Sequence, residues 1–112
     1  MSDVAGLPER YAADLERTVD RLRSLALVRL GAEFHPEATR ADAARDLEQQ
    51  LADQAADLSA TSRRTVPRLA DSAVGDQLAV VGRDLLEEAV LAERLDVLES
   101  SAAALLALRR RL

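Results

Sequence analysis

The chain has 112 residues, a formal net charge of -5, and 20 Leu, 9 Val and 22 Ala beside a single Phe and a single Tyr. This length indicates one domain, residues 1–112, and a core rich in Leu and Ala but poor in aromatic residues favours packed α-helices over β-sheets. The acidic balance counts against a general nucleic-acid binder, the absence of cysteine excludes disulfides and thiolate chemistry, and no apolar run reaches the roughly eighteen residues needed to span a membrane.

The first predicted helix covers residues 8–30, after a flexible lead at residues 1–7. Pro8 suits the first turn of a helix, where its missing N–H is not needed, and Gly31 suits the position just past the last turn. The lead lacks the basic and apolar blocks of a signal peptide, so we expect a cytoplasmic protein. One apolar stripe at helical spacing joins the two ends: Tyr11, Leu15, Val19, Leu22, Ala26 and Leu30.

The second predicted helix covers residues 39–62. Thr39, followed three residues later by Asp42, resembles a capping box and marks the helix start. A narrow seam of Leu and Ala favours coiled-coil-like packing against one neighbour. That seam consists of Ala44, Leu47, Leu51, Ala55 and Leu58.

The third predicted helix covers residues 67–111. Pro67 gives a start signal, and no Gly, Pro or Asn follows Gly82. Such a helix measures about 65 Å at ~1.5 Å per residue, roughly twice the length of each helix before it. Its apolar register slips near residues 86–90, which rotates the buried face or introduces a kink. We therefore expect an antiparallel bundle of three helices, or a monomeric four-helix bundle if the third breaks between Glu93 and Ser101.

The C-terminal half of the third helix is apolar on nearly every side. Helices of that kind are normally buried all round, and the two shorter helices cannot cover it alone. A two-fold homodimer, the commonest oligomer symmetry, would let each long helix cover its mate. The predicted dimer interface consists of Leu91, Leu95, Leu98, Ala102, Leu105, Leu106, Leu108 and Leu112.

Four small residues lie roughly along one side of the third helix: Gly75, Ala79, Gly82 and Ala89. Glycine within a helix costs about 0.5–1 kcal/mol relative to Ala, so two of them need a reason. We interpret the four as a close crossing with another helix or as a local kink. A ligand lying against the exposed backbone is the functional alternative.

The sequence offers no constellation for catalysis, a cofactor or a metal. His35 is the only histidine, and the Glu-x-x-His pattern of di-iron bundles is absent, so we expect His35 to make a local hydrogen bond in a turn. Acidic residues on the second and third helices alternate with Arg or Gln, which is typical of a solvated surface.

Two groups of arginines are the remaining candidates. Arg63, Arg64 and Arg68 lie at the second connection, and Arg109, Arg110 and Arg111 close the chain. Cations at a helix C-terminus are favoured by the helix dipole, which is a sufficient reason for the second group. Without neighbouring aromatic residues, both groups are weak nucleic-acid signals.

The sequence therefore predicts a small non-enzymatic helical interaction module, an adaptor or regulatory subunit, that homodimerises through its long C-terminal helix. An unidentified protein is the expected partner, membrane insertion is not expected, and nucleic acid is a disfavoured partner. Two alternatives stay open. One is a nucleic-acid-binding regulatory protein that uses the two arginine groups, and the other is a small-ligand-binding or catalytic bundle with an Arg/Asp-lined cleft near Gly75–Gly82.

Overall fold

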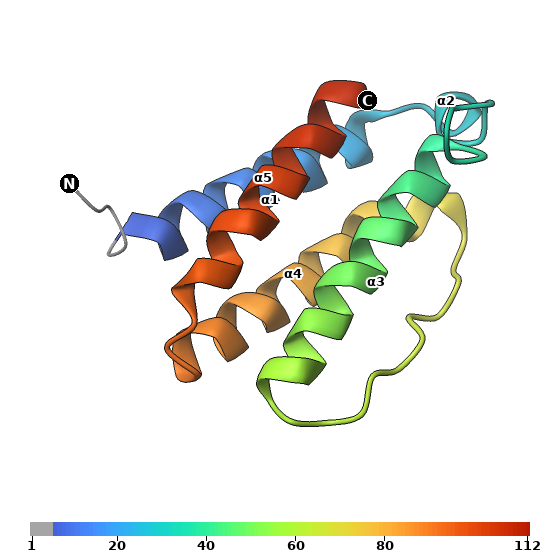
Figure 1. The fold of residues 1–112 in the computed structure, drawn as a ribbon. Coiled ribbons are helices and arrows are strands. Elements are labelled where there is room, and N and C mark those ends of the chain that lie inside the picture. The colour runs from blue at the N-terminus through green and yellow to red at the C-terminus, as the bar shows by residue number, and fades with distance from the viewer. Residues whose placement is uncertain (1–5) are drawn as a thin grey trace.

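The computed structural model describes residues 6–112, and Figure 1 shows their arrangement. These residues form no β-strand, so the predicted all-α class is confirmed. The predicted count of three helices is wrong, and most of the predicted lead lies outside the described residues. The elements are α1 (Leu7–Ser24), α2 (Leu27–Leu30), α3 (Arg40–Leu58), the short 3₁₀ helix η2 (Asp71–Ala73), α4 (Val74–Leu91) and α5 (Leu95–Arg111).

The first predicted helix is divided into α1 and α2. The chain bends at Leu25 and Ala26, whose ψ angles of 134° and 146° are extended. This bend places Leu30 in the core and leaves Leu27 and Val28 in solvent. Neither Leu nor Ala breaks a helix by itself, so packing ends α1 here, against the local helix propensity.

Helix α3 begins where the sequence predicts and ends earlier. The Thr39 hydroxyl accepts a hydrogen bond from the backbone N–H of Asp42 at 3.0 Å and caps the helix. Beyond Leu58 the chain reverses at Ala60, whose φ of 57° is left-handed. Glycine usually fills this position, so the sequence gives no sign of the ending.

Residues 59–70 form an extended linker, which corrects both the predicted helix end at 62 and the predicted helix start at 67. Side chains of α3 and α4 hold the linker through hydrogen bonds to its backbone. Gln49 Nε2 donates to the Arg64 carbonyl (3.0 Å), Gln49 Oε1 accepts from the Val66 N–H (2.8 Å), Arg45 donates to the Leu69 carbonyl (2.9 Å) and Gln77 donates to the Pro67 carbonyl (2.7 Å).

The long third helix is interrupted at residues 92–94, within which Glu93 takes a left-handed φ of 55°. The backbone N–H groups of Glu93 and Arg94 donate to the carbonyls of Val90 and Ala89 and close α4. A left-handed residue costs about 1 kcal/mol, whereas burying one leucine contributes about 1.5–3 kcal/mol. Folding α5 back over the bundle therefore outweighs the strain, and the continuous helix over 67–111 is wrong.

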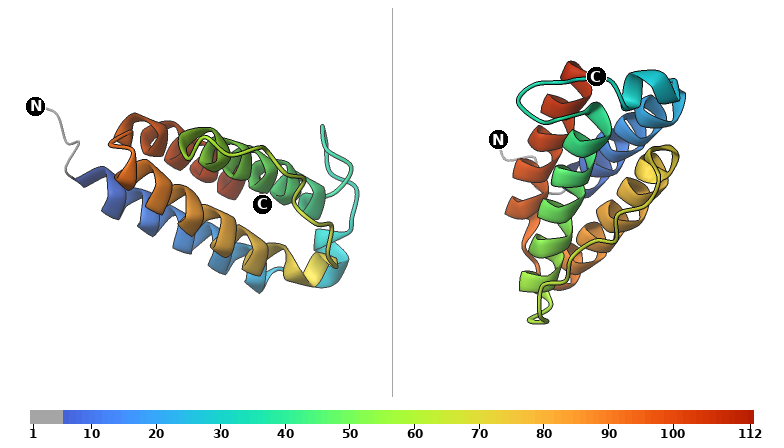
Figure 2. Two further views of the ribbon diagram at one scale, coloured as in Figure 1. Left: turned by 90° about the horizontal axis from the view of Figure 1, so that it is seen from below. Right: turned by 90° about the vertical axis from the view of Figure 1, so that its right-hand side faces the viewer.

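The four long helices form two layers, α1 beside α4 and α3 beside α5 (Figure 2, left). The expected antiparallel arrangement is only partly right, because α1 and α5 run in the same direction: Thr18 meets Leu105, and Arg21 meets Leu112. Helices α3 and α4 also run the same way (Figure 1). The linker permits this, since residues 59–70 reach about 40 Å when extended, more than the ~28 Å length of α3.

Candidate functional site

The predicted dimer interface lies mostly inside the single chain. The premise that one copy cannot shelter these leucines is wrong, because α5 folds back and packs against α1. Four of the predicted residues are buried in the chain's own core, namely Leu98, Leu105, Leu108 and Leu112. Leu95, Ala102 and Leu106 are half-buried, and Leu91 is largely exposed.

Polar contacts fix the end of α5 to α1 as well. Arg109 donates to the Asp14 carbonyl at 3.1 Å and to the Thr18 hydroxyl at 2.9 Å, and it pairs with the Asp14 carboxylate at 2.9 Å. The carbonyl of Leu112 accepts hydrogen bonds from Arg21 of α1 at 3.0 Å and from Arg29 of α2 at 3.3 Å. The C-terminal end of the chain is therefore engaged within the molecule.

The small residues of α4 lie at its crossing with α1. A Cβ atom added at Gly82 would lie 2.4 Å from Leu15 Cδ1, and one added at Gly75 would lie 2.9 Å from Arg23 Cγ. Those distances leave no room for a side chain unless the Leu15 and Arg23 side chains of α1 shift. The two alanines grouped with them, Ala79 and Ala89, are buried. Close helix packing therefore accounts for the two glycines without a ligand.

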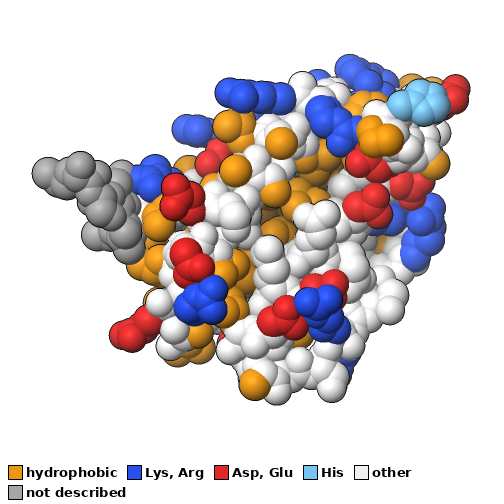
Figure 3. All heavy atoms as spheres, in the orientation of Figure 1, with side chains coloured by type: hydrophobic (Ala, Val, Ile, Leu, Met, Phe, Trp, Pro, Cys, Tyr) orange, Lys and Arg blue, Asp and Glu red, His pale blue; other side chains and the backbone are white. Residues whose placement is uncertain are grey.

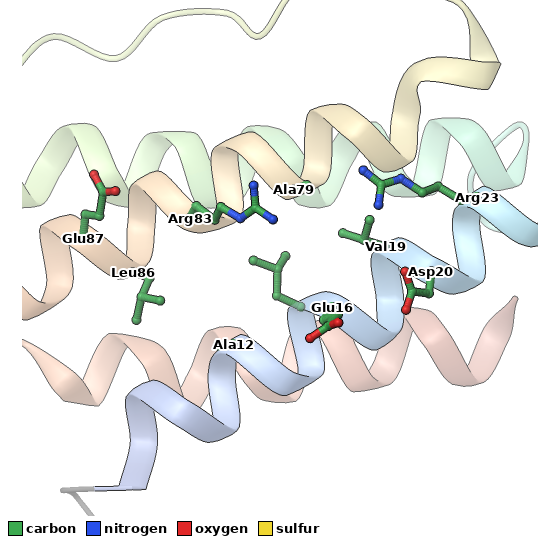
Figure 4. Close-up of a pocket in the computed structure, with 10 residues that line it drawn as sticks. Ala12, Glu16, Val19, Asp20, Arg23, Ala79, Arg83, Leu86 and Glu87 are labelled. Carbon is green, nitrogen blue, oxygen red and sulfur yellow. The ribbon is translucent and has the colours of Figure 1, made fainter.

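Beside this crossing, α1 and α4 border a cleft of about 520 Å³ (Figure 4). Glu16 and Asp20 come from α1, and Arg83 comes from α4. At one end Arg23 donates a hydrogen bond to Asp76 at 2.8 Å. The cleft is the charged one that the sequence suggests near Gly75–Gly82, but its lining residues include no histidine, serine, threonine or cysteine.

A larger and more apolar groove, of about 680 Å³, lies between the linker and α4; we call it the linker groove. Its apolar lining is formed chiefly by Val66, Pro67, Leu69, Val80 and Val81. Val80 is 59% exposed and Leu69 is 49% exposed. The groove arises because side-chain hydrogen bonds hold the linker by its backbone, which leaves this part of α4 uncovered.

The linker groove continues into an acidic hollow of about 400 Å³ between α3 and α4. Ala52 and Arg64 line both the groove and the hollow. Asp84, Glu87 and Glu88 also line the hollow, and none of the three makes an ion pair within residues 6–112. The combined surface is thus apolar at one end and acidic at the other.

Most of the predicted arginine candidates are neutralised by carboxylates. The hydrogen bond from Arg111 holds the pKa of the Glu37 carboxyl below its usual value. Among residues 6–112, only Arg64 and Arg110 of the six have no carboxylate partner. The pairs are Arg63 with Asp57 (2.7 Å), Arg68 with Asp42 (3.1 Å), Arg109 with Asp14 (2.9 Å) and Arg111 with Glu37.

One C-terminal arginine, Arg111, also contacts the only phenylalanine, together with Arg40 of α3. The guanidinium groups of Arg40 and Arg111 lie 4.6 Å and 4.7 Å from the centre of the Phe34 ring, a cation–π distance. Blue and red side chains are interspersed over the face seen in Figure 3, without a large area of one sign. A basic surface suited to a phosphate backbone is therefore not formed on that face.

His35 lies in an exposed turn, where its Nε2 is 3.1 Å from a carboxylate oxygen of Glu33. In the part of the chain that the structure describes, no three potential ligands lie close enough together to hold a metal ion. No helix in that part is both long and apolar enough to cross a membrane.

One candidate residue was missed by sequence reasoning: Glu48 of α3. Its side chain is 0% exposed, and neither carboxyl oxygen has a hydrogen-bonding partner among the described residues. Burial raises the pKa of Glu48 to about 8, against the opposing effect of the nearby Arg45 charge. The available signal was its spacing, because residue 48 shares the inner face of the helix with Ala44 and Leu51.

Comparisons with protein families, with curated proteins and with solved structures found no match. The two candidate surfaces, the cleft between α1 and α4 and the linker groove, therefore have to be compared by their volume, charge and exposed apolar side chains. The cleft between α1 and α4 is charged, whereas the linker groove combines the larger volume with exposed apolar side chains and an acidic end. Of the two, the linker groove is therefore the larger and the more apolar.

Proposed function

We propose that the chain is a small non-enzymatic interaction module that binds a partner protein through the linker groove. The observation that carries this proposal is that Leu69 and Val80 are both exposed and line the same groove. Burying apolar surface is favourable by roughly 25 cal/mol per Å², and soluble monomers seldom leave a contiguous apolar groove open.

The partner segment we expect is an amphipathic helix with a basic end. Its apolar face would lie between the linker and α4, in a familiar mode of helix recognition. Its basic residues would face Asp84, Glu87 and Glu88, which lack ion-pair partners within residues 6–112. Complementary charges of this kind raise the association rate and fix the orientation of the bound segment.

The proposed binding surface is the linker groove and no longer the C-terminal helix that the sequence indicated. A homodimer through Leu98 and Leu105 would have to unpack the core that these residues already form. Nucleic-acid binding is less well supported, because four of the six candidate arginines pair with carboxylates and the chain carries a net charge of -5.

A capture experiment with matched variants tests the proposal. Val80→Asp places a charge in the linker groove, and Val28→Asp places the same charge on α2, where the valine is also exposed. Tagged wild type and both variants are expressed in the native cell, crosslinked, and their bound proteins quantified by mass spectrometry. We expect partners that are retained by wild type and Val28→Asp and reduced about tenfold or more by Val80→Asp, a loss of ~1.4 kcal/mol or more.

Two outcomes would contradict the assignment. Equal recovery of the same partners with Val80→Asp would remove the linker groove as the binding surface. Equal loss with both variants would show that added negative charge, and not the position in the groove, controls binding. Thermal unfolding of each variant checks that the fold is kept, since both substitutions lie at exposed positions.

A further inference from the structure

The cleft between α1 and α4 has an apolar base. Leu15, Val19 and Ala79 line it and are also buried in the core, so they lie at its bottom. Ala12 and Leu86, both half-buried, extend this base. The volume of about 520 Å³ lies in the range of small-molecule pockets, and the cleft shares no lining residue with the linker groove.

Charged side chains of both signs line the walls of this cleft. The five are Glu16, Asp20 and Arg23 of α1 and Arg83 and Glu87 of α4. Arg23 is paired with Asp76. The side chains of the other four make no ion pair or hydrogen bond within residues 6–112. Opposite charges therefore line one cleft without neutralising each other.

The two arginines converge on one side of the cleft. Figure 4 shows their side chains extending toward each other along α4, with the carboxylates of Glu16 and Asp20 on the α1 side. Arg23 contacts Asp76 through Nε at 2.8 Å and Nη2 at 2.7 Å, which leaves its Nη1 without a partner among the described residues. Two guanidinium groups placed in this way favour a carboxylate between them, because charge-assisted hydrogen bonds are stronger than neutral ones.

The opposite walls select a ligand that carries both charges. A simple anion held by the arginines would be repelled by Glu16 and Asp20 on the α1 side. A simple cation held by those carboxylates would be repelled by Arg83, whose charge no carboxylate of the described residues offsets. A zwitterion satisfies both walls, and an apolar group on it would be buried against the base.

We propose that this cleft binds a small zwitterion with an apolar side group, the chemistry of a free amino acid. The carboxylate of the ligand lies between Arg23 and Arg83, and its ammonium group faces Glu16 and Asp20. Its apolar group covers the base of the cleft. Glu87 lies beyond Arg83, at the end of the cleft away from Arg23 (Figure 4), and makes no contact in this arrangement.

Three related probes test the charge requirement: phenylalanine is a zwitterion, N-acetylphenylalanine an anion and phenylalaninamide a cation. Each is titrated into isotopically labelled full-length protein at about pH 6, where the ammonium and carboxylate groups involved are charged. The backbone N–H resonances of Leu15, Val19 and Arg83 report binding. We expect saturable shifts with phenylalanine in the millimolar range, and about fivefold or more weaker binding of each singly charged probe, since each loses one exposed ionic contact.

Arg83→Gln removes one charge at an exposed position, so the variant is expected to fold. It should weaken phenylalanine binding about fivefold or more, whereas Arg17→Gln, the same change at an exposed position of α1 outside the cleft, should leave binding unchanged. The proposal is overturned if phenylalanine gives no saturable shift with wild type, if a singly charged probe binds as tightly, if Arg83→Gln binds as well as wild type, or if Arg17→Gln weakens binding equally. The inference does not depend on the partner-binding role of the linker groove.

Discussion

Helix α5 and the linker, residues 59–70, cover the bundle in opposite ways. Helix α5 is the more apolar segment, yet its leucines are buried against α1 and its Arg109 is bonded to Asp14 and Thr18. The linker contains few large apolar residues and is held mainly by hydrogen bonds to its backbone, which leaves Leu69 and Val80 exposed. The surface available to a partner thus depends on how completely the chain covers itself, and the most apolar segment is not the most exposed one.

The largest expected effect lies beside the linker, at Glu48. The carboxyl group has a pKa of 4.5 in the unfolded chain and about 8 in the folded protein, so only the folded state keeps the proton between these values. Stability therefore falls as pH rises from about 4.5 to about 8. Glu48→Gln cannot ionise and should exceed wild type by as much as about 5 kcal/mol above pH 8, at ~1.4 kcal/mol per pKa unit, and match it near pH 4.

Urea unfolding of wild type and Glu48→Gln at several pH values measures this difference. Glu99→Gln, at an exposed position of α5, is the matched control and should show no comparable dependence on pH. A constant difference between Glu48→Gln and wild type across the whole range would mean that Glu48 is not held protonated by burial.

The next effect contrasts the two regions directly. Leu105 of α5 is 0% exposed, so Leu105→Ala should lower the free energy of unfolding by about 2–5 kcal/mol. Val80→Ala in the linker groove should change it by no more than about 0.5 kcal/mol, because that side chain is already in solvent. Chemical denaturation of both variants checks the contrast, and similar losses at the two positions would show that the groove is part of the folded core.

A smaller effect is expected at the turn before α5. Glu93 has a φ of 55°, so Glu93→Gly should stabilise the protein by about 1 kcal/mol by relieving the left-handed strain. Glu87→Gly, within α4 and exposed, should instead destabilise it by about 1 kcal/mol. The sign of the change at Glu93 is the informative quantity, since a continuous helix would make both substitutions destabilising.

Local signals in the sequence predicted the starts of α1 and α3 and the helix end before Gly31, but not the end of α3 at Leu58. The Thr39 cap and the proline at residue 8 are local features, and α3 and α1 begin beside them. Ala60 and Glu93 adopt left-handed conformations that are usually given to glycine, because burial of distant residues outweighs the local cost. Nothing within a few residues of Ala60 reports that burial, so the linker was not predicted. A break of the third helix between Glu93 and Ser101 was predicted only as the alternative to a continuous helix, and the observed turn at residues 92–94 lies at the start of that range.

The candidate sites also differ in whether a sequence pattern can predict them. The linker groove depends on hydrogen bonds from Gln49 and Gln77 to backbone ten or more positions away along the chain, a relation that no periodic pattern displays. Glu48 was within reach of sequence reasoning, since a lone acid on the inner face of α3 breaks the apolar line. The expected Arg/Asp-lined cleft was likewise found from residue types, although its chemistry offers only charge.

The distance between the two ends of the α4–α5 segment tests the account most directly. The chain has no cysteine, so Ser72→Cys and Arg110→Cys, both at exposed positions, can carry spin labels, diluted with unlabelled protein to isolate distances within one molecule. The account expects a distance well below the 41 Å longest extent of the molecule, because α5 returns along the bundle. A distance near the ~57 Å of an unbroken helix would contradict it, leave the leucines of α5 unsheltered, and restore that helix as the binding surface.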